Sequence, residues 1–430
     1  MLRALNHPNY RLFFSGQSIS LVGTWMTRIA TSWLVYRLTN SALLLGVVGF
    51  AGQIPSFLLA PVAGVLVDRW NRHRLLVATQ AMAMAQSLAL ATLTLTGVVK
   101  IWHVIALSAF QGVINAFDMP ARQAFVVEMV EKPEDLSNAI ALNSSMVNAA
   151  RLLGPSLAGV IIAAVGEGWC FMLDGVSYLA VIASLLLMRL PRAVAEQIEE
   201  ENLFRQFRDG WNYIVGFMPI RNMLLLLALV SLVGMPYTVL MPVYANEILG
   251  GGPYTLGWLM AASGMGALMG ALFLAARKTV LGLGKFIPIM AGAFGAGLIA
   301  LSFSRALWLS LLLMVVTGLG FMVQMAVSNT LLQTIVEKDK RGRVMSFYAA
   351  AVMGTTPFGS LLAGVVAARI GTTHTLLISG ICCIVGAMWF ARTLPALRHD
   401  VRPIYVEMGI LPQAASGIKK TSEITFPPED

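Results

Sequence analysis

The sequence has few charged residues for its length. Of its 430 residues, 12% are Asp, Glu, Lys or Arg, whereas soluble globular domains average about 25%. Hydrophobic residues make up 57% of the chain. This composition excludes an ordinary soluble domain and predicts an integral membrane protein.

Cysteine and histidine are also scarce. The three cysteines, Cys170, Cys382 and Cys383, all fall in apolar runs, and two of them are adjacent, so no disulfide framework is expected. The five histidines lack the spacing of metal ligands, and no GxxxxGK[ST] phosphate loop occurs. We therefore expect no metal site, no cofactor, no direct use of ATP and no enzyme activity.

Long hydrophobic runs are abundant instead. A membrane-spanning helix needs about 20 apolar residues. Twelve runs meet this length, which predicts an all-α membrane protein of twelve transmembrane helices in two six-helix halves. The runs cover about 12–38, 41–67, 75–97, 101–119, 138–165, 169–190, 221–249, 254–276, 286–304, 307–335, 344–368 and 372–394.

The basic residues are distributed unevenly between the two sides. Two of the 30 lysines and arginines, Arg28 and Arg151, fall inside predicted spans, and only four lie in loops on one side. The net charge of +9 thus reflects topology rather than nucleic-acid binding. We predict a multi-pass protein of the cytoplasmic (inner or plasma) membrane with both termini cytoplasmic. The four exceptions are Arg37, Lys100, Arg305 and Arg369.

The chain contains an internal repeat. "MPARQAFVVEMVEK" from Met119 and "MAVSNTLLQTIVEK" from Met325 share their ends and their apolar pattern at an offset of 206 residues. Repeated halves of this kind place a substrate site between them near the bilayer midplane, and transport proceeds by rocking one half against the other.

The repeat and the charge pattern suggest four segments. We expect an N-terminal half at 1–190, a cytoplasmic linker with an amphipathic helix at 191–220, and a C-terminal half at 221–394. The last segment, 395–430, has no sustained apolar period and is expected to be a disordered cytoplasmic tail.

One loop gathers charge between the second and third runs. The stretch "GVLVDRWNRHRLL" carries Gly64, Asp68, Arg69 and Arg72, and it resembles the loop signature of the major facilitator superfamily. Asn71 stands where the family usually has glycine, and asparagine tolerates the left-handed conformation that a tight turn needs. The resemblance implies the major facilitator fold and a cytoplasmic latch.

The same resemblance implies a partner for the latch. In the family an acid stands at the cytoplasmic end of the fourth helix, and Asp118 matches that position. We expect Asp68 and Arg72 to hold the fourth and eleventh helices together on the cytoplasmic side.

A second motif bears on direction. "ARLLGPSLAG" resembles the antiporter signature of the superfamily through Gly154, Pro155 and Gly159, which implies export. Ser108 stands where many proton-coupled members carry arginine, so the proton route departs from theirs. Taken together, "FDMPARQAF", "NAIALNSSMVNAARLLGP" and similar stretches resemble the transmembrane secretion effector branch, which includes the enterobactin exporter.

Polar side chains recur at helical spacing in several runs. Interhelical hydrogen bonds or a water-filled cavity could account for them, but a charge inside the membrane costs about 2.5 to 3.5 kcal/mol and needs a partner or a cavity. The cavity candidates are Gln17, Thr24, Arg28, Gln111, Asn115, Asn148, Arg151 and Gln324.

Asp174 is the candidate for proton coupling, paired in turn with Arg28 or Arg151. The sequence thus predicts a monomeric secondary transporter in the lipid bilayer that exports a small amphipathic, anionic, siderophore-like compound by alternating access and proton antiport. The alternatives are a multidrug efflux pump for cations or neutral compounds, a uniporter or importer on the same scaffold, and a non-transporting sensor or scaffold.

Overall fold

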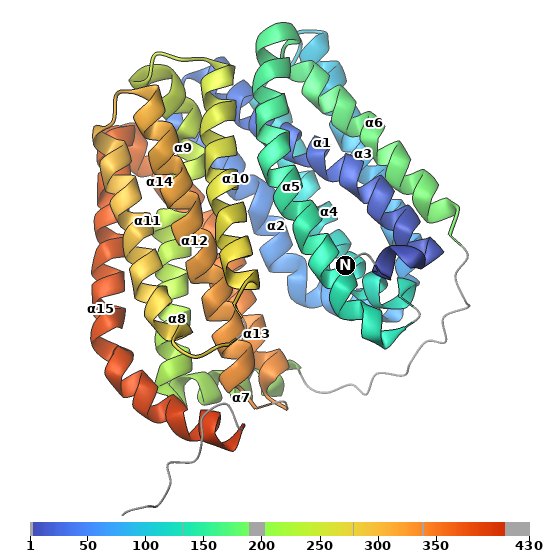
Figure 1. Cartoon of the computed structure of the whole chain (residues 1–430). Helices are drawn as coiled ribbons and strands as arrows, with labels where there is room; N and C mark the ends of the chain where they lie inside the picture. The colour runs from blue at the N-terminus through green and yellow to red at the C-terminus, as the bar shows by residue number, and fades with distance from the viewer. Residues whose placement is uncertain (1–2, 131, 189–202, 278, 338, 409–430) are drawn as a thin grey trace, which may run out of the picture.

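The computed structural model describes residues 3–130, 132–188, 203–277, 279–337 and 339–408, and these contain helices and no strands. Figure 1 shows two helical bundles side by side, with the N-terminal turn η1 (Arg3–Asn6) and helix α7 (Leu203–Gly216) toward the same end. We call this end the terminus face and the other end the opposite face.

The first bundle contains six helices joined by short connections. A proline at the first turn of α1 and α5, and Ser41 and Asn71 at the N-caps of α2 and α3, fix where these helices start. The helices are α1 (Pro8–Thr39), α2 (Ala42–Arg69), α3 (Arg72–Leu95), α4 (Ile101–Met129), α5 (Pro133–Val165) and α6 (Glu167–Leu186).

The described residues of the second bundle form six spans, of which the first is interrupted by two π-helical turns and the fifth by one. The first of these spans also contains Pro236 and Pro242, whose missing N–H groups interrupt the helical hydrogen bonding. The elements are α8 (Met218–Leu229), η2 (Val230–Gly234), α9 (Tyr237–Val243), η3 (Tyr244–Ile248), α10 (Pro253–Ala275), η4 (Leu283–Lys285), α11 (Phe286–Phe303), α12 (Leu307–Ile335), α13 (Arg341–Ala349), η5 (Ala350–Gly354), α14 (Thr355–Ile370) and α15 (Thr372–Glu407).

The helices have the dimensions of membrane spans. Within the described ranges, eleven helical segments are long and apolar enough to cross a bilayer. The twelfth, α1, has 32 residues but carries Arg28 and a row of polar side chains, which lower its hydropathy. Large apolar residues such as Trp308, Phe303 and Leu187 are exposed on the outside of the bundles, as expected of lipid-facing surfaces.

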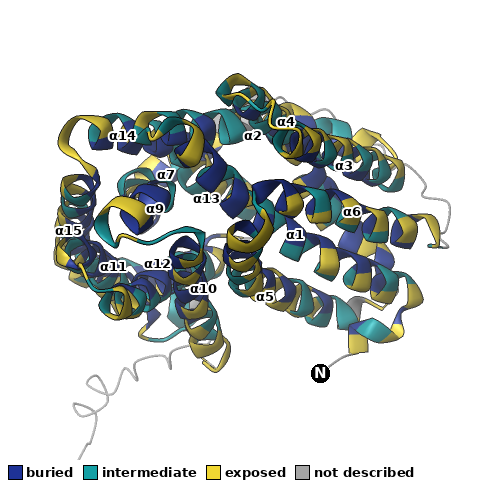
Figure 2. Ribbon diagram, turned by 90° about the horizontal axis from the view of Figure 1, so that it is seen from above, coloured by how far each residue is buried: buried dark blue, intermediate teal, exposed yellow. Residues whose placement is uncertain are grey.

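The repeat found in the sequence corresponds to whole helices. Helices α4 and α12 have the same length, and each end of α12 lies 206 residues after the corresponding end of α4. The two bundles meet along α2 with α14 and α5 with α10, and these pairs lie side by side in Figure 2. The repeat therefore generates a two-fold-like contact between the bundles.

Two helices extend further than the sequence predicted. Helix α4 continues ten residues past 119, because Phe125, Val126 and Met129 are buried there. Helix α15 continues past Pro395 to Glu407 because Leu397 and Val401 pack against the bundle, so the predicted disorder is wrong for 395–407. Residues 409–430 of the predicted tail and 191–202 of the predicted linker lie outside the described residues.

Helix α7, in the segment predicted to hold an amphipathic helix, is attached to the second bundle. Asp209 lies 3.7 Å from Arg343 of α13, and the ring of Trp211 lies 6.1 Å from that of Phe347. These contacts fasten α7 to the terminus face of the second bundle.

Candidate functional site

The charged loop between α2 and α3 has a different geometry from the one predicted. Asn71 is not left-handed but extended, and its side chain caps α3 by accepting from the N–H of Arg74 at 2.9 Å. Arg72 donates to Asp68 at 3.1 Å and to Glu128 of α4 at 2.6 Å. The fourth-helix partner of Arg72 is therefore Glu128, at the end of α4.

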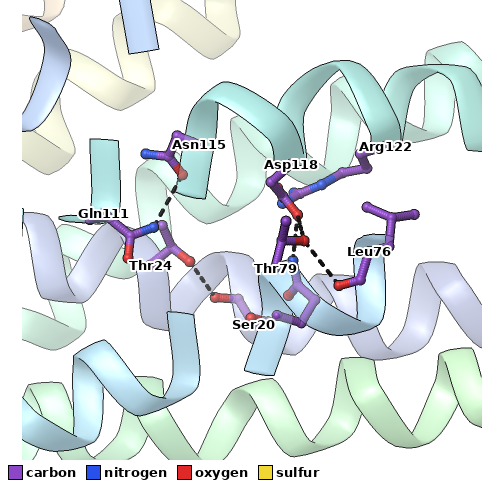
Figure 3. Close-up of polar contacts among 9 residues, drawn as sticks. Ser20, Thr24, Leu76, Thr79, Gln111, Asn115, Asp118 and Arg122 are labelled. Carbon is purple, nitrogen blue, oxygen red and sulfur yellow. Dashed lines mark hydrogen bonds and ion pairs between the residues drawn. The ribbon is translucent and has the colours of Figure 1, made fainter. Parts of the chain in front are cut away.

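Asp118, which was predicted to be that partner, lies about three turns before the end of α4. Its carboxylate accepts hydrogen bonds from Thr79 Oγ1 at 3.0 Å and Gln80 Nε2 at 2.7 Å, and it forms an ion pair with Arg122 (Figure 3). Because α4 is ten residues longer than predicted, this position falls inside the bundle. Asp118 is buried and belongs to a polar cluster, so its assignment to the latch is wrong.

A small polar cavity adjoins this cluster. It has a volume of about 50 Å³ and lies between α1, α3, α4 and α6. Among the polar side chains that line it, the Oε1 atoms of Gln17 and Gln80 are buried and have no partner in the described part of the chain. A polar cavity of this size is suited to water. It brings together four predicted cavity residues, Gln17, Thr24, Gln111 and Asn115, and Figure 3 shows the last three beside Asp118.

The two arginines predicted inside the membrane share one aromatic partner. The guanidinium of Arg28 lies 4.6 Å, and that of Arg151 5.1 Å, from the ring centre of Trp25. Arg28 is exposed and Arg151 half-buried, although both lie near the middle of their helices. Neither has an ion pair or hydrogen bond within the residues the structure describes. Two unpaired cations therefore occur together at mid-helix depth.

Gly154 of the antiporter-like motif permits this arrangement. A Cβ atom at this position would collide with Cβ of Trp25 and lie 3.1 Å from the carbonyl oxygen of Val22. The missing side chain lets α5 approach α1 closely enough for Arg151 to reach the same indole as Arg28. A Cβ at Gly264 of α10, in the second bundle, would lie 2.9 Å from the carbonyl oxygen of Arg151, so the site borders both bundles.

Asp174 of α6 lies apart from these arginines. It is 2% exposed, and its Oδ2 accepts from Thr27 Oγ1 at 2.9 Å and from Ser87 Oγ at 3.0 Å. Its Oδ1 has no hydrogen-bond partner among the described residues, and a Cβ at Gly23 would lie 2.7 Å from it. The expected ion pair between Asp174 and Arg28 or Arg151 is absent from the described contacts.

Four glycines allow close approaches between the backbones of the two bundles. A Cβ at Gly46 of α2 would lie 3.0 Å from Cα of Gly364 of α14, and a Cβ at Gly257 of α10 would lie 2.9 Å from Cα of Gly159 of α5. The same Gly257 Cβ would lie 2.7 Å from the carbonyl oxygen of Pro155. We call these two contacts, Gly46 with Gly364 and Gly257 with Pro155 and Gly159, the glycine seal. The motif residues Pro155 and Gly159 thus belong to one of its two contacts.

The seal lies toward the opposite face. There the Oη of Tyr36, on α1, donates to Glu247 Oε1 at 3.0 Å or to Asn246 Oδ1 at 3.1 Å, which links the bundles by a polar contact. At the terminus face, a Cβ at Gly64 would meet no atom within 4 Å. The bundles are joined at the opposite face and separate toward the terminus face, as Figure 1 shows.

The remaining predicted cavity residues lie elsewhere. Asn148 is half-buried on α5 and donates to the carbonyl of Ser144 at 2.9 Å. Gln324 is fully buried in α12, and its amide group has no partner in the described ranges. Neither residue lines the 50 Å³ cavity.

Sequence reasoning missed several residues that shape this region. Glu128 could have been found by extending α4 along its apolar period to Met129, because Phe125 and Met129 are four residues apart. Trp25 and Gly257 are single residues whose role depends on a contact with another helix. No periodicity or motif could have identified them.

Comparisons with known proteins identify the family to which this architecture belongs. A family model described as transmembrane secretion effector matches residues 2–405. The staphyloferrin A transporter of Staphylococcus aureus (strain NCTC 8325 / PS 47) is 27% identical over 383 residues, covering 88% of this chain and 95% of that protein. Macrolide efflux protein A of Streptococcus pyogenes is 25% identical over 397 residues, with the same coverage.

A solved structure agrees in fold. A bacterial homologue of the human lysosomal transporter Spinster, in its inward-facing and unoccupied conformation, matches with a TM-score of 0.71 at 12% identity, over 91% of this chain and 97% of that one. Together with the family model, the two-bundle fold and the glycine seal, this establishes that the chain is a secondary transporter of the transmembrane secretion effector family in the major facilitator superfamily.

Proposed function

We propose that this transporter exports a small amphipathic anion from the cytoplasm by alternating access, in exchange for protons. The observation that carries the proposal is that the guanidinium groups of Arg28 and Arg151, neither of which has an ion pair among the described residues, both lie close to the ring of Trp25. Leaving charges unpaired at mid-membrane depth is costly unless a ligand or water compensates them. A planar guanidinium binds carboxylate and catecholate oxygens in a bidentate manner, while the indole offers an apolar surface.

The uneven distribution of basic residues supports a cytoplasmic terminus face, with both termini inside. In that orientation the glycine seal, formed by the contacts of Gly46 with Gly364 and of Gly257 with Gly159, closes the outward side, and the site around Trp25 is reached from the cytoplasm. The residues 1–190 and 221–394 act as the two rocking halves, within one monomer. Loading from inside and release outside then require the seal to open and the loop around Asp68 to close.

Asp174 is our proposed proton site. A buried carboxyl group with one unpartnered oxygen, held by two hydroxyl groups, is poised to gain a proton when the charged form loses solvation. Because no ion pair joins Asp174 to Arg28 or Arg151 in this conformation, the proposed competition between proton and substrate acts through α1. This helix carries both Thr27, a hydrogen-bond donor to Asp174, and Arg28.

The test measures uptake into everted membrane vesicles, in which export runs inward. The panel contains citrate-based and catecholate siderophores as anions, and permanent cations of similar size. We expect uptake of an anion, acceleration by an imposed pH gradient, and at least a tenfold loss in Arg151→Gln. Arg11→Gln is the matched control, because Arg11 is exposed near the start of α1 at the terminus face.

Uptake confined to permanent cations and unchanged by Arg151→Gln would contradict the anion site. This result would favour the multidrug alternative, which the name of the relative macrolide efflux protein A also supports. Anion uptake that a pH gradient leaves unchanged would favour a uniporter and contradict antiport.

A further inference from the structure

A second cavity lies away from the pathway, at the terminus face of the second bundle. It has a volume of about 250 Å³ and is bounded by α8, the α10–α11 connection, the end of α12 and the extension of α15. We call it the terminus groove. Its floor is apolar and consists of buried side chains, namely Met223, Leu331, Ile335, Leu397 and Val401.

Three cations surround this apolar floor. Lys285, Arg398 and Arg402 line the groove, and all three are exposed. No acidic residue lines it, and none of the three cations has an ion pair within the described chain. On the same helix, Asp400 pairs with His399 at 3.3 Å. The groove therefore combines an apolar interior with an uncompensated positive rim.

The helical extension of α15 produces this combination. Residues four apart lie on one face of a helix, so Leu397 and Val401 point together to the floor, while Arg398 and Arg402 form a parallel row at the rim. Long cationic side chains place their charge at the polar boundary while their stems cover apolar surface. This part of α15 follows the segment that packs against α8, and in Figure 1 it lies at the end of the bundle where the membrane-spanning helices end.

We propose that the terminus groove binds an anionic phospholipid, with an acyl chain against the apolar floor and the phosphate among the three cations. Charge complementarity selects this occupant, because a basic pocket between transmembrane helices attracts anionic head groups, and a zwitterionic lipid gains much less from the rim. The site is separate from the proposed substrate site and does not depend on what the protein transports.

Native mass spectrometry of the full-length protein in detergent tests this site. The probes are phosphatidylglycerol and phosphatidylcholine with identical palmitoyl and oleoyl chains. We expect the first phosphatidylglycerol to bind about tenfold more tightly than phosphatidylcholine. The triple variant Lys285→Gln, Arg398→Gln and Arg402→Gln should lose this preference.

Two further variants test whether the preference comes from this site rather than from the overall positive charge of the face, and whether the apolar floor contributes to binding. Arg11, Arg74 and Arg208 are exposed cations toward the same face, and their joint change to Gln should leave the preference intact. Gly284 lines the groove, and a Cβ there would lie 3.6 Å from a methyl group of Leu394, an ordinary contact. Gly284→Leu should therefore extend its side chain into the groove and weaken the binding of both lipids.

Equal binding of the two lipids by the unaltered protein would overturn the proposal. Equal binding is also the expected result if residues 409–430, rather than a lipid, occupy the groove. A preference that survives the triple variant, or that the matched control abolishes equally, would also overturn it.

Discussion

The glycine seal gives a prediction whose magnitude can be worked from the structure. In Gly257→Ala the new methyl group would lie 2.7 Å from the carbonyl oxygen of Pro155 and 2.9 Å from Cα of Gly159. Both contacts are with backbone, so no side chain can rotate away, and helices α5 and α10 must separate by roughly 0.7 Å to restore ordinary contact distances. Overpacking of this kind costs about 1 to 3 kcal/mol.

That cost applies only to the conformation in which the seal is closed. A change of about 1 to 3 kcal/mol shifts a two-state equilibrium by roughly 5- to 150-fold, here toward the conformation open at the opposite face. Because the repeat places Gly46 and Gly364 in the equivalent contact, Gly46→Ala should act in the same direction.

Hydrogen exchange followed by mass spectrometry measures this shift. Peptides covering 36–46 and 244–257 should exchange faster in Gly257→Ala, and transport should slow because one state is overpopulated. Gly292→Ala is the matched control, since its Cβ would lie 3.9 Å from Cβ of Ala387, an ordinary contact. Unchanged exchange in both peptides of Gly257→Ala, with transport like that of the unaltered protein, would refute the role of the seal.

Three other changes test the seal at the opposite face, the latch at the terminus face and the proton site. Tyr36→Phe removes the hydrogen bond to Glu247, worth about 0.5 to 1.5 kcal/mol, and should raise exchange in the same peptides by a smaller factor; no change would remove Tyr36 from the seal. Asp68→Asn should leave membrane insertion intact but slow transport several-fold, whereas normal transport rates in vesicles would contradict the latch. Asp174→Asn keeps the volume and removes the titration, so uptake that still accelerates under an imposed pH gradient would show that the proton travels elsewhere.

The sequence predicted the fold because membrane burial leaves a strong signal. Every predicted span contains a helix, and the boundaries at 307–335 agree fully, since the apolar run and the helix begin and end together there. The prediction fell short where packing outweighed composition. The predicted span ended near 119, yet buried Phe125 and Met129 hold the following segment helical and extend α4 to Met129, which places Glu128 in its last turn.

Several residues of the candidate site could be predicted from the sequence, but the residues that they contact could not. Arg28 and Arg151 were identifiable as intramembrane charges, and both border one site. The sequence could not show that they share Trp25, because this pairing depends on the close approach of α1 and α5 at Gly154. For the same reason, Asp118 was assigned to a latch although its partners are Thr79 and Gln80 on the neighbouring helix.

The low hydropathy of α1 has a consequence for how the protein is made. Within the described chain, α1 falls short of the hydropathy of the eleven other spans, and Arg28 alone adds about 2.5 to 3.5 kcal/mol to its transfer into lipid. In the folded protein α1 packs against α5 and α6, which emerge from the ribosome more than a hundred residues later. Helix α1 therefore gains its stable position in the bilayer only when α5 and α6 arrive, so the N-terminal bundle inserts as a cooperative unit.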